Sequence, residues 1–321
     1  MTVGLLSRRA SLGLILSTAA LAACGKGGGA GGGEVLRVGS QRGGTKTIML
    51  ASKMLEGVPY RIEWSEFPAA QHLLEALGAG AVDVGGVGDA PFLFAYQAGS
   101  PIKAVQSTRY NPRNIANAVL VPKGSPAKSF ADLRGRKIAT GRGSVGHFLL
   151  LRALEKYAMK PADVQIIFLP PGDAKAAFAS GSIDAWVVWN PYAGAALLHD
   201  GARAIVDARG VTTGYGYMVA GDAAIAARRP LIADFLARYA RGQQWAAAHL
   251  DDYAAALAKE TGLPLADARY FADNELRAVP SDAHVLAELS SVQETFRAAG
   301  AIQGTRPLEA AFDRGFGVKA T

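Results

Sequence analysis

The sequence has 321 residues, with 34 lysines and arginines against 27 aspartates and glutamates, which gives a formal net charge of +7. The positive residues are scattered and never form a run of four, so the chain lacks the basic track that binds a phosphate backbone and suits a small anionic ligand better. The length is enough for two medium-sized domains, and the single cysteine excludes an internal disulfide as a source of stability.

The first 23 residues have the pattern of an export signal. Arg8-Arg9 precede an apolar run from Ala10 to Ala23, which is too short to span a bilayer. The arginine pair resembles a twin-arginine signal, but Ser11 stands where that pattern prefers phenylalanine, so export by the Tat route and by the Sec route both stay open. We predict that residues 1–23 are a signal peptide that is removed from the mature protein.

The lone cysteine follows this segment directly. Leu21-Ala22-Ala23-Cys24 resembles a bacterial lipobox, in which the cysteine becomes the lipidated first residue; the alternative is a buried structural thiol. Residues 24–33 are rich in glycine, which predicts a flexible tether. We therefore expect Cys24 to be lipidated and the mature protein to lie on the periplasmic or cell-surface side of the cytoplasmic membrane, held only by this anchor.

From Glu34 onwards, strand patterns alternate with helix patterns, which is typical of an α/β fold. Strands are expected at 35–38, 60–64 and 82–86, with helices that run to about Glu56 and over 69–77. After Pro230 the sequence turns helical, with helices expected at 231–249, 251–261, 265–270 and 281–299.

The stretch from Lys137 to Leu154 passes from a β-prone run through a glycine-rich loop into an apolar-faced helix. The loop, Gly141-Arg142-Gly143-Ser144-Val145-Gly146, has the G-x-G-x-x-G spacing of dinucleotide sites. Such a site also needs an acidic residue at the end of the next strand, but that strand, 164–169, ends in Pro170-Pro171. A nucleotide site, an empty tight turn and a small oxyanion site stay open. We prefer the oxyanion site, because unpaired N–H groups and the helix dipole attract an anion there.

Two pairs of segments repeat about one hundred residues apart. Residues 38–44 are similar to 138–144, and residues 80–84 are similar to 181–185, which predicts two lobes of similar topology. The apolar runs 118–122 and 217–220 bracket the second copy, and we expect them to pair with each other as hinge strands. The second lobe is then an insertion, with lobe 1 at residues 34–121 and 219–321 and lobe 2 at residues 122–218.

Seven short motifs carry a resemblance to a known family: Glu66-Phe67-Pro68, Leu74-Glu75-Ala76-Leu77, Gly88-Asp89-Ala90-Pro91, Arg142 to His147, Asp173 to Phe178, Asp184-Ala185-Trp186 and Trp189-Asn190-Pro191-Tyr192. Between about Leu36 and Ile205 the chain resembles the substrate-binding proteins of ABC importers for alkanesulfonates, in the nitrate, sulfonate and taurine family. The resemblance implies a two-lobed periplasmic-binding-protein fold of type 2, with two hinge crossings, that closes on its ligand. It also implies a monomer that delivers a small anion to an ABC permease and its ATPase.

Two departures from the family concern the ligand. Ser144-Val145-Gly146 stand where the family often has a run of serines, which leaves two hydroxyls fewer in the loop. Asn190 stands where the family commonly has aspartate in its W-D-P-Y motif, and the loss of a carboxylate near an anion site relaxes repulsion. The expected ligand stays an organic sulfonate or a related small oxyanion. An alkanesulfonate comes first, and taurine, nitrate and sulfate esters are alternatives.

Ligands of such sheets bind at the carboxyl ends of the strands, which predicts a single cleft. The residues expected around it are Gln41, Gly88, Asp89, Ser144, Gly146, His147, Trp189, Asn190 and Tyr215. Ser144 and Gln41 are expected to donate hydrogen bonds to the anion. Asp89 precedes a proline and is expected either to cap a helix, so that it aims N–H groups at the ligand, or to touch the ligand itself.

Further residues have two open interpretations. His147 either donates to the anion or packs in the core. Arg42 and Arg142 either reach the anion or face solvent. Trp189, Tyr192 and Tyr215 either form a wall for the organic tail of the ligand or are core aromatics.

The sequence gives little support for a catalytic function. The G-x-S-x-G elbow is absent, and the five histidines, at 72, 147, 199, 249 and 284, do not cluster at metal-ligand spacing. We predict no catalytic residue, no metal, no cofactor and no nucleic-acid partner. The alternatives are an enzyme or binding protein for a pyrimidine or thiamine precursor on the same scaffold, and a sensory ligand-binding domain.

Overall fold

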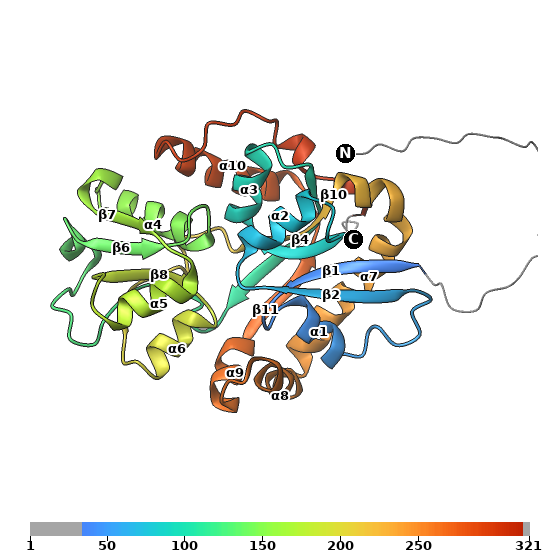
Figure 1. Ribbon diagram of the computed structural model, residues 1–321, viewed down its shortest axis with the longest axis horizontal. Coiled ribbons are helices and arrows are strands. Elements are labelled where there is room, and N and C mark those ends of the chain that lie inside the picture. Colours follow the sequence, from blue (N-terminus) through green and yellow to red (C-terminus); the bar gives the residue numbers. More distant parts are fainter. Residues whose placement is uncertain (1–33, 317–321) are drawn as a thin grey trace, which may run out of the picture. The chain divides into compact units, whose positions relative to one another are not determined.

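The computed structural model (Figure 1) describes residues 34–316, except for the side chains of Pro112 and Glu275. The predicted signal peptide, Cys24 and the tether at 24–33 lie outside the described residues. Within the described part, strands and helices alternate along the chain, so the predicted α/β class is confirmed. None of the described helices is long and apolar enough to cross a membrane.

One sheet has six strands in the order β11-β4-β10-β3-β1-β2. Strand β1 pairs in parallel with β2 and β3, whereas β10 is antiparallel to β3 and β4, and β11 is antiparallel to β4. The strands are β1 (Val35–Gln41), β2 (Arg61–Phe67), β3 (Val84–Gly88), β4 (Ile102–Pro112), β10 (Tyr215–Gly221) and β11 (Asn274–Val279).

A second sheet has five strands in the order β7-β6-β8-β5-β9. Strand β6 pairs in parallel with β7 and β8, and β5 is antiparallel to β8 and β9. The strands are β5 (Asn117–Val121), β6 (Lys137–Thr140), β7 (Gln165–Phe168), β8 (Ala185–Trp189) and β9 (Arg203–Asp207). Short 3₁₀ helices lie at η1 (Phe130–Leu133), η2 (Pro161–Asp163), η3 (Glu309–Ala311) and η4 (Arg314–Phe316).

The internal repeat expected from the sequence is present in the topology. The order β1-α1-β2-α2-β3-α3 recurs as β6-α4-β7-α5-β8-α6, and the strand order β2-β1-β3 recurs as β7-β6-β8. The helices are α1 (Thr45–Ala51), α2 (Ala70–Gly78), α3 (Asp89–Gln97), α4 (Val145–Lys156), α5 (Pro171–Ala179) and α6 (Tyr192–Leu198). Each of these helices follows a parallel strand, so each begins near the carboxyl end of a strand, where α/β sheets bind ligands.

Two strand glycines let α2 lie close to the six-stranded sheet. A Cβ at Gly39 would stand 2.1 Å from Cδ1 of Leu73, and a Cβ at Gly85 would stand 2.9 Å from the same atom. Leu73, Leu74 and Leu77 recur at helical spacing and are fully buried on this face. Glycine weakens a strand interior, but here it makes room for the leucine that fixes the helix on the sheet.

The C-terminal part of the chain packs against both faces of the six-stranded sheet. Side chains of α7 (Asp222–Ala248), α8 (Leu250–Thr261) and α9 (Leu265–Ala272) share a core with α1, whereas α10 (Ala283–Ala298) shares a core with α2 and α3. Figure 1 shows α8 near α1 and α10 near α3. Helices α8, α9 and α10 lie within two residues of their predicted bounds, whereas α7 begins nine residues before its predicted start at 231 and contains Pro230. Strand β11 was not predicted, because its six residues lie in a helical context and gain their partner only at the edge of β4.

The expected pairing of two hinge strands is wrong. Strand β5 pairs with β8 and β9, and β10 pairs with β3 and β4, so the two strands lie in different sheets. The chain instead passes between the sheets in the segments 113–116 and 208–214. Both runs are short and apolar because both strands are buried, and hydropathy alone does not indicate which sheet supplies a strand's partners.

Candidate functional site

A cavity of about 310 Å³ lies at the carboxyl ends of β1, β3 and β8. Its wall takes residues from both sheets and from the segment 208–214. Seven of the residues predicted for the cleft line it: Gln41, Gly88, Asp89, Ser144, Trp189, Asn190 and Tyr215. The volume lies at the lower end of the range for small-molecule sites, which fits a small organic ligand.

Four helices begin at the cavity wall. The wall includes Gly44 and Thr45 at the start of α1, Ala70 and Gln71 at the start of α2, Gly88 and Asp89 at the start of α3, and Ser144 and Val145 at the start of α4. Each helix start has backbone N–H groups without an intrahelical partner and a partial positive charge from the helix dipole. The convergence of four such ends gives the cavity wall N–H donors and a partial positive charge, which favour an anion.

Fixed charge contributes little to this wall. The residues that line the cavity include no lysine or arginine, and Asp89 is their one carboxylate. No group of three or more His, Cys, Asp or Glu side chains within residues 34–316 could hold a metal ion. An anion in the cavity is therefore held by N–H and O–H dipoles, with no full positive charge in the wall.

Asp89 is the first residue of α3, and its neighbour Gly88 is the N-cap, so the predicted cap is wrong by one position. Helix φ/ψ angles begin at Asp89, and its Oδ1 accepts a hydrogen bond from the Ala90 N–H at 2.6 Å. Oδ2 accepts from the Thr213 hydroxyl, which ties α3 to the segment 208–214. Burial raises the pKa of the Asp89 carboxyl to about 6, although these two hydrogen bonds act in the opposite direction.

Ser144 is the N-cap of α4. Its Oγ accepts from the His147 N–H at 3.1 Å and donates to the Gly141 carbonyl at 2.7 Å. The hydroxyl has only one proton, and the Gly141 carbonyl takes it, so donation from Ser144 to an anion requires that this bond break. The N–H groups of Val145 and Gly146 have no acceptor within residues 34–316, so they are the free donors of this helix end.

Gly146 and His147 lie behind the cavity wall. A Cβ at Gly146 would stand 2.7 Å from the Val187 carbonyl oxygen, so this glycine lets α4 lie close to β8. His147 is buried, accepts from the Gly143 N–H at 3.2 Å and packs its ring against Phe168 and Phe296. Burial lowers its pKa to about 4, with a smaller effect of Arg142, so the neutral ring serves packing.

Neither predicted loop arginine lines the cavity. Arg42 donates to the Thr261 carbonyl at 2.6 Å, and the Arg142 guanidinium lies 3.8 Å from the centroid of the Phe168 ring. Tyr192 also lies outside the wall, with its ring against Trp186 in the core of the five-stranded sheet. These side chains have structural partners that are distant in sequence, which local patterns do not reveal.

Asn190 and Gln41 are placed by backbone contacts. The Asn190 Oδ1 accepts from the Gly194 N–H at 3.0 Å in the first turn of α6, and the Gln41 Nε2 donates to the Gly86 carbonyl at 3.4 Å. The Asn190–Pro191 peptide bond is cis. The two hydrogen bonds hold the Asn190 and Gln41 side chains at the ends of β8 and β1, where their amides border the cavity.

Several wall residues were not predicted: Thr45, Thr108, Tyr110, Phe148, Tyr217 and Tyr239. Tyr110 lies two residues before the end of β4, and Tyr239 lies in the middle of α7, almost 130 positions later. The position of Tyr110 near the carboxyl end of a strand is a signal that the sequence offers. Tyr239 has no such signal, because a buried aromatic residue in an amphipathic helix is ordinary core.

Comparison with known proteins adds independent findings. Residues 65–252 match the protein family described as NMT1/THI5 like. A protein of Escherichia coli (strain K12) that is named for the binding of aliphatic sulfonates is 37% identical over 234 residues, which cover 72% of this chain and 73% of that protein.

Two solved structures share the fold. The periplasmic aliphatic sulphonate binding protein SsuA from Escherichia coli has a TM-score of 0.76 at 33% identity. The alkanesulfonate-binding protein SsuA from Xanthomonas axonopodis pv. citri, bound to MOPS, has a TM-score of 0.80 at 31% identity. Each comparison covers 87% of this chain and 97% of the other. The predicted periplasmic-binding-protein fold and the family resemblance are confirmed.

Proposed function

The chain belongs to the NMT1/THI5-like family, and from this premise we propose that it is the extracytoplasmic solute-binding protein of an ABC importer. It captures an organic sulfonate or a related small oxyanion, an alkanesulfonate foremost, and delivers it to the permease and its ATPase. The observation that carries the proposal is the convergence of the starts of α1, α2, α3 and α4 on a wall without lysine or arginine. The ligands in the names of the relatives support the same class.

A sulfonate suits this wall because it has one negative charge and three acceptor oxygens. Each helix end contributes about 0.3–2 kcal/mol and each charge-assisted hydrogen bond about 1.5–3 kcal/mol. A micromolar site needs about 8 kcal/mol. Three or four helix ends with the free N–H group of Val145, which lines the cavity, are therefore sufficient, and no buried arginine is required.

The binding cycle uses the two crossings between the sheets. We place lobe 1 at residues 34–112 and 215–316 and lobe 2 at residues 117–207, with the crossings as the hinge. This division moves β5 into lobe 2 and β10 into lobe 1, in keeping with their strand partners. A ligand that touches the starts of both α3 and α4 interacts with both lobes at once, so it favours the closed arrangement.

Export and anchoring complete the proposal. The signal peptide at residues 1–23 directs the chain out of the cytoplasm, Cys24 is lipidated, and residues 24–33 tether a monomer to the membrane. A periplasmic location of the Escherichia coli relative supports export. A lipid anchor keeps the binding protein close to its permease, which raises the effective concentration of one at the other.

A thermal-shift panel tests the proposed function. The probes are alkanesulfonates, taurine, sulfate esters, nitrate and pyrimidines, each added to the mature protein. A ligand at 100 times its Kd stabilises the folded state by about 2.7 kcal/mol, which is a clear rise in melting temperature. We expect alkanesulfonates to give that rise. A rise with pyrimidines or thiamine precursors alone would instead support the alternative function on the same scaffold.

A further inference from the structure

One side of the cavity wall is rich in hydroxyl groups. This hydroxyl wall consists of Thr45 from α1, Thr108 and Tyr110 from β4, and Tyr239 from α7, and all four residues line the cavity. Thr45, Thr108 and Tyr239 are buried, and Tyr110 is half-buried. Within residues 34–316 the hydroxyls of Thr108 and Tyr110 have no hydrogen-bond partner. These groups therefore remain available to whatever fills the cavity.

A fully buried amide lies behind this wall. Gln243 follows Tyr239 by one helical turn in α7 and is fully buried, yet neither its Nε2 nor its Oε1 has a hydrogen-bond partner in the described part of the chain. Burial raises the pKa of the Tyr239 hydroxyl, whereas the neighbouring side chains of Thr45 and Gln243 lower it. Gln243 does not reach the cavity itself, but Thr108 and Tyr110 do. Polar side chains without a partner are rare in a largely buried wall because each costs free energy, so the hydroxyls of Thr108 and Tyr110 indicate that the cavity content completes their bonding.

We infer that the hydroxyl wall binds the organic part of the ligand, and that the ligand of this protein is a sulfonate whose tail has a hydroxyl or ether oxygen. The inference rests on the proposed function, which places the sulfonate head at the helix starts. An alkyl tail that fills the cavity would leave the hydroxyls of Thr108 and Tyr110 unpaired. A tail oxygen accepts hydrogen bonds from these hydroxyls, and a site built in this way discriminates strongly against the analogue that lacks the oxygen.

Calorimetric titration with matched pairs of probes tests this inference. The probes are alkane-1-sulfonates of two to six carbons and their ω-hydroxy counterparts, which differ by one oxygen. We expect the ω-hydroxy compound to bind at least tenfold more tightly at one or more chain lengths. Tyr110→Phe and Tyr239→Phe should each reduce this preference to less than threefold. Tyr253→Phe is the matched control, because Tyr253 is a buried tyrosine of α8 outside the cavity wall.

The outcomes separate the inference from the proposed function. Equal affinity within each pair, with no effect of either tyrosine variant, would show that water alone meets the hydroxyl wall and would overturn the inference. Binding of sulfonates of both kinds would then still support the proposed function. If neither kind binds, the proposed function itself fails, and the inference fails with it.

Discussion

Asp83 and Asp184 occupy the same place in the two repeats, and each carboxylate accepts a hydrogen bond of 2.8 Å from the backbone of the neighbouring strand. The donor is the Arg37 N–H in β1 for Asp83 and the Lys137 N–H in β6 for Asp184. Each aspartate also donates its own N–H to the carbonyl of the same partner, at 2.8 and 2.9 Å. In each repeat, this aspartate lies just before the third strand, and its hydrogen bonds connect that segment to the first strand.

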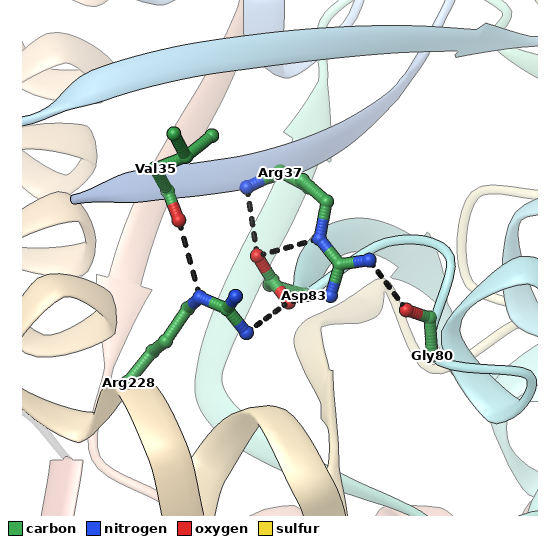
Figure 2. Close-up of polar contacts among 5 residues, drawn as sticks. All are labelled: Val35, Arg37, Gly80, Asp83 and Arg228. Carbon is green, nitrogen blue, oxygen red and sulfur yellow. Dashed lines mark hydrogen bonds and ion pairs between the residues drawn. The ribbon is translucent and has the colours of Figure 1, made fainter. Parts of the chain in front are cut away.

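The surroundings of the two aspartates differ. Asp83 is fully buried, and its oxygens also accept from the guanidinium groups of Arg37 and Arg228 at 2.6 and 3.3 Å (Figure 2). Arg228 lies at the bend of α7, where its φ of −134° interrupts the helix two residues before Pro230. The Asp184 side chain is 40% exposed, and within residues 34–316 its one ion-pair partner is Arg136, at 3.8 Å.

We therefore predict that Asp83→Ala destabilises the fold much more than Asp184→Ala. Removal of a buried carboxylate leaves two arginines and a buried N–H without their partner, which costs about 3 kcal/mol or more. The exposed counterpart should cost about 1 kcal/mol, because water replaces the lost acceptor. Urea unfolding of both variants measures the difference, and equal losses would contradict the role of the Asp83 cluster.

Ser144 variants test whether the start of α4 binds the anion. Ser144→Asp and Ser144→Asn both keep an N-cap side chain, so both should fold with little loss of stability. Only the aspartate adds a negative charge beside the free N–H groups of Val145 and Gly146. We expect Ser144→Asp to weaken binding of an alkanesulfonate by at least tenfold and Ser144→Asn by a few-fold at most. Wild-type affinity of a folded Ser144→Asp protein, measured by calorimetry, would place the anion elsewhere.

Because the pKa of Asp89 is raised, we expect the affinity for the ligand to depend on pH. Burial raises the pKa of its carboxyl from 3.8 to about 6, so the group is ionised at pH 7.5 and largely protonated at pH 5. A sulfonate stays charged over this range, and charges about 6 Å apart repel by roughly 1–3 kcal/mol at effective dielectric constants of 20–80. Affinity for the sulfonate should therefore rise as the pH falls from 7.5 to 5. Titration of Asp89→Asn at both pH values should show nearly constant affinity; an unchanged slope would implicate another group.

The same shift predicts how the stability of the ligand-free protein depends on pH. Because the folded-state pKa of Asp89 is above its value in the unfolded chain, the folded state binds the proton more tightly. The stabilisation from this group is therefore fully present below about pH 4 and is lost as the pH rises to about 6. Asp89→Asn should flatten the stability profile in this window in denaturant titrations at successive pH values. A profile that is as steep in the variant as in the wild type would exclude Asp89 as the source.

A side chain added at Gly146 should lower the stability of the fold through steric clash alone. A Cβ added there would stand 2.7 Å from the Val187 carbonyl oxygen and from the Thr140 Oγ1, so Gly146→Ala should destabilise the fold by about 1–3 kcal/mol. Gly172→Ala in α5 is the matched control, because nothing lies within 4 Å of its added Cβ. That change should be neutral or stabilise by up to about 1 kcal/mol. Thermal unfolding of both variants would contradict the close packing of α4 if their melting temperatures agreed.

Cys24→Ser tests the anchor. The variant should appear in the soluble extracytoplasmic fraction, since it lacks the cysteine at which the lipid anchor is proposed. Wild-type protein, fractionated in parallel, should remain with the membrane. Retention of the variant on the membrane would refute the lipobox interpretation without bearing on the ligand site.

Local patterns in the sequence are enough to place much of the architecture. The strands expected at 35–38, 60–64 and 82–86 are β1, β2 and β3, each shifted or extended by a few residues at its ends. Periodicity and turn residues are local signals, so they place elements well. The repeat and the glycine-rich loop before α4 were also readable, because a helix start after a strand has a short and specific pattern.

Local patterns do not indicate which strands pair or which residues complete the cavity wall. Strands β5 and β10 look alike in the sequence and belong to different sheets, and His147 follows the loop directly yet packs behind the wall. Tyr110 and Tyr239 meet at the cavity from positions far apart in the chain. The physical reason is that a cavity wall consists of contacts between distant segments, and their energies depend on packing that no local pattern encodes.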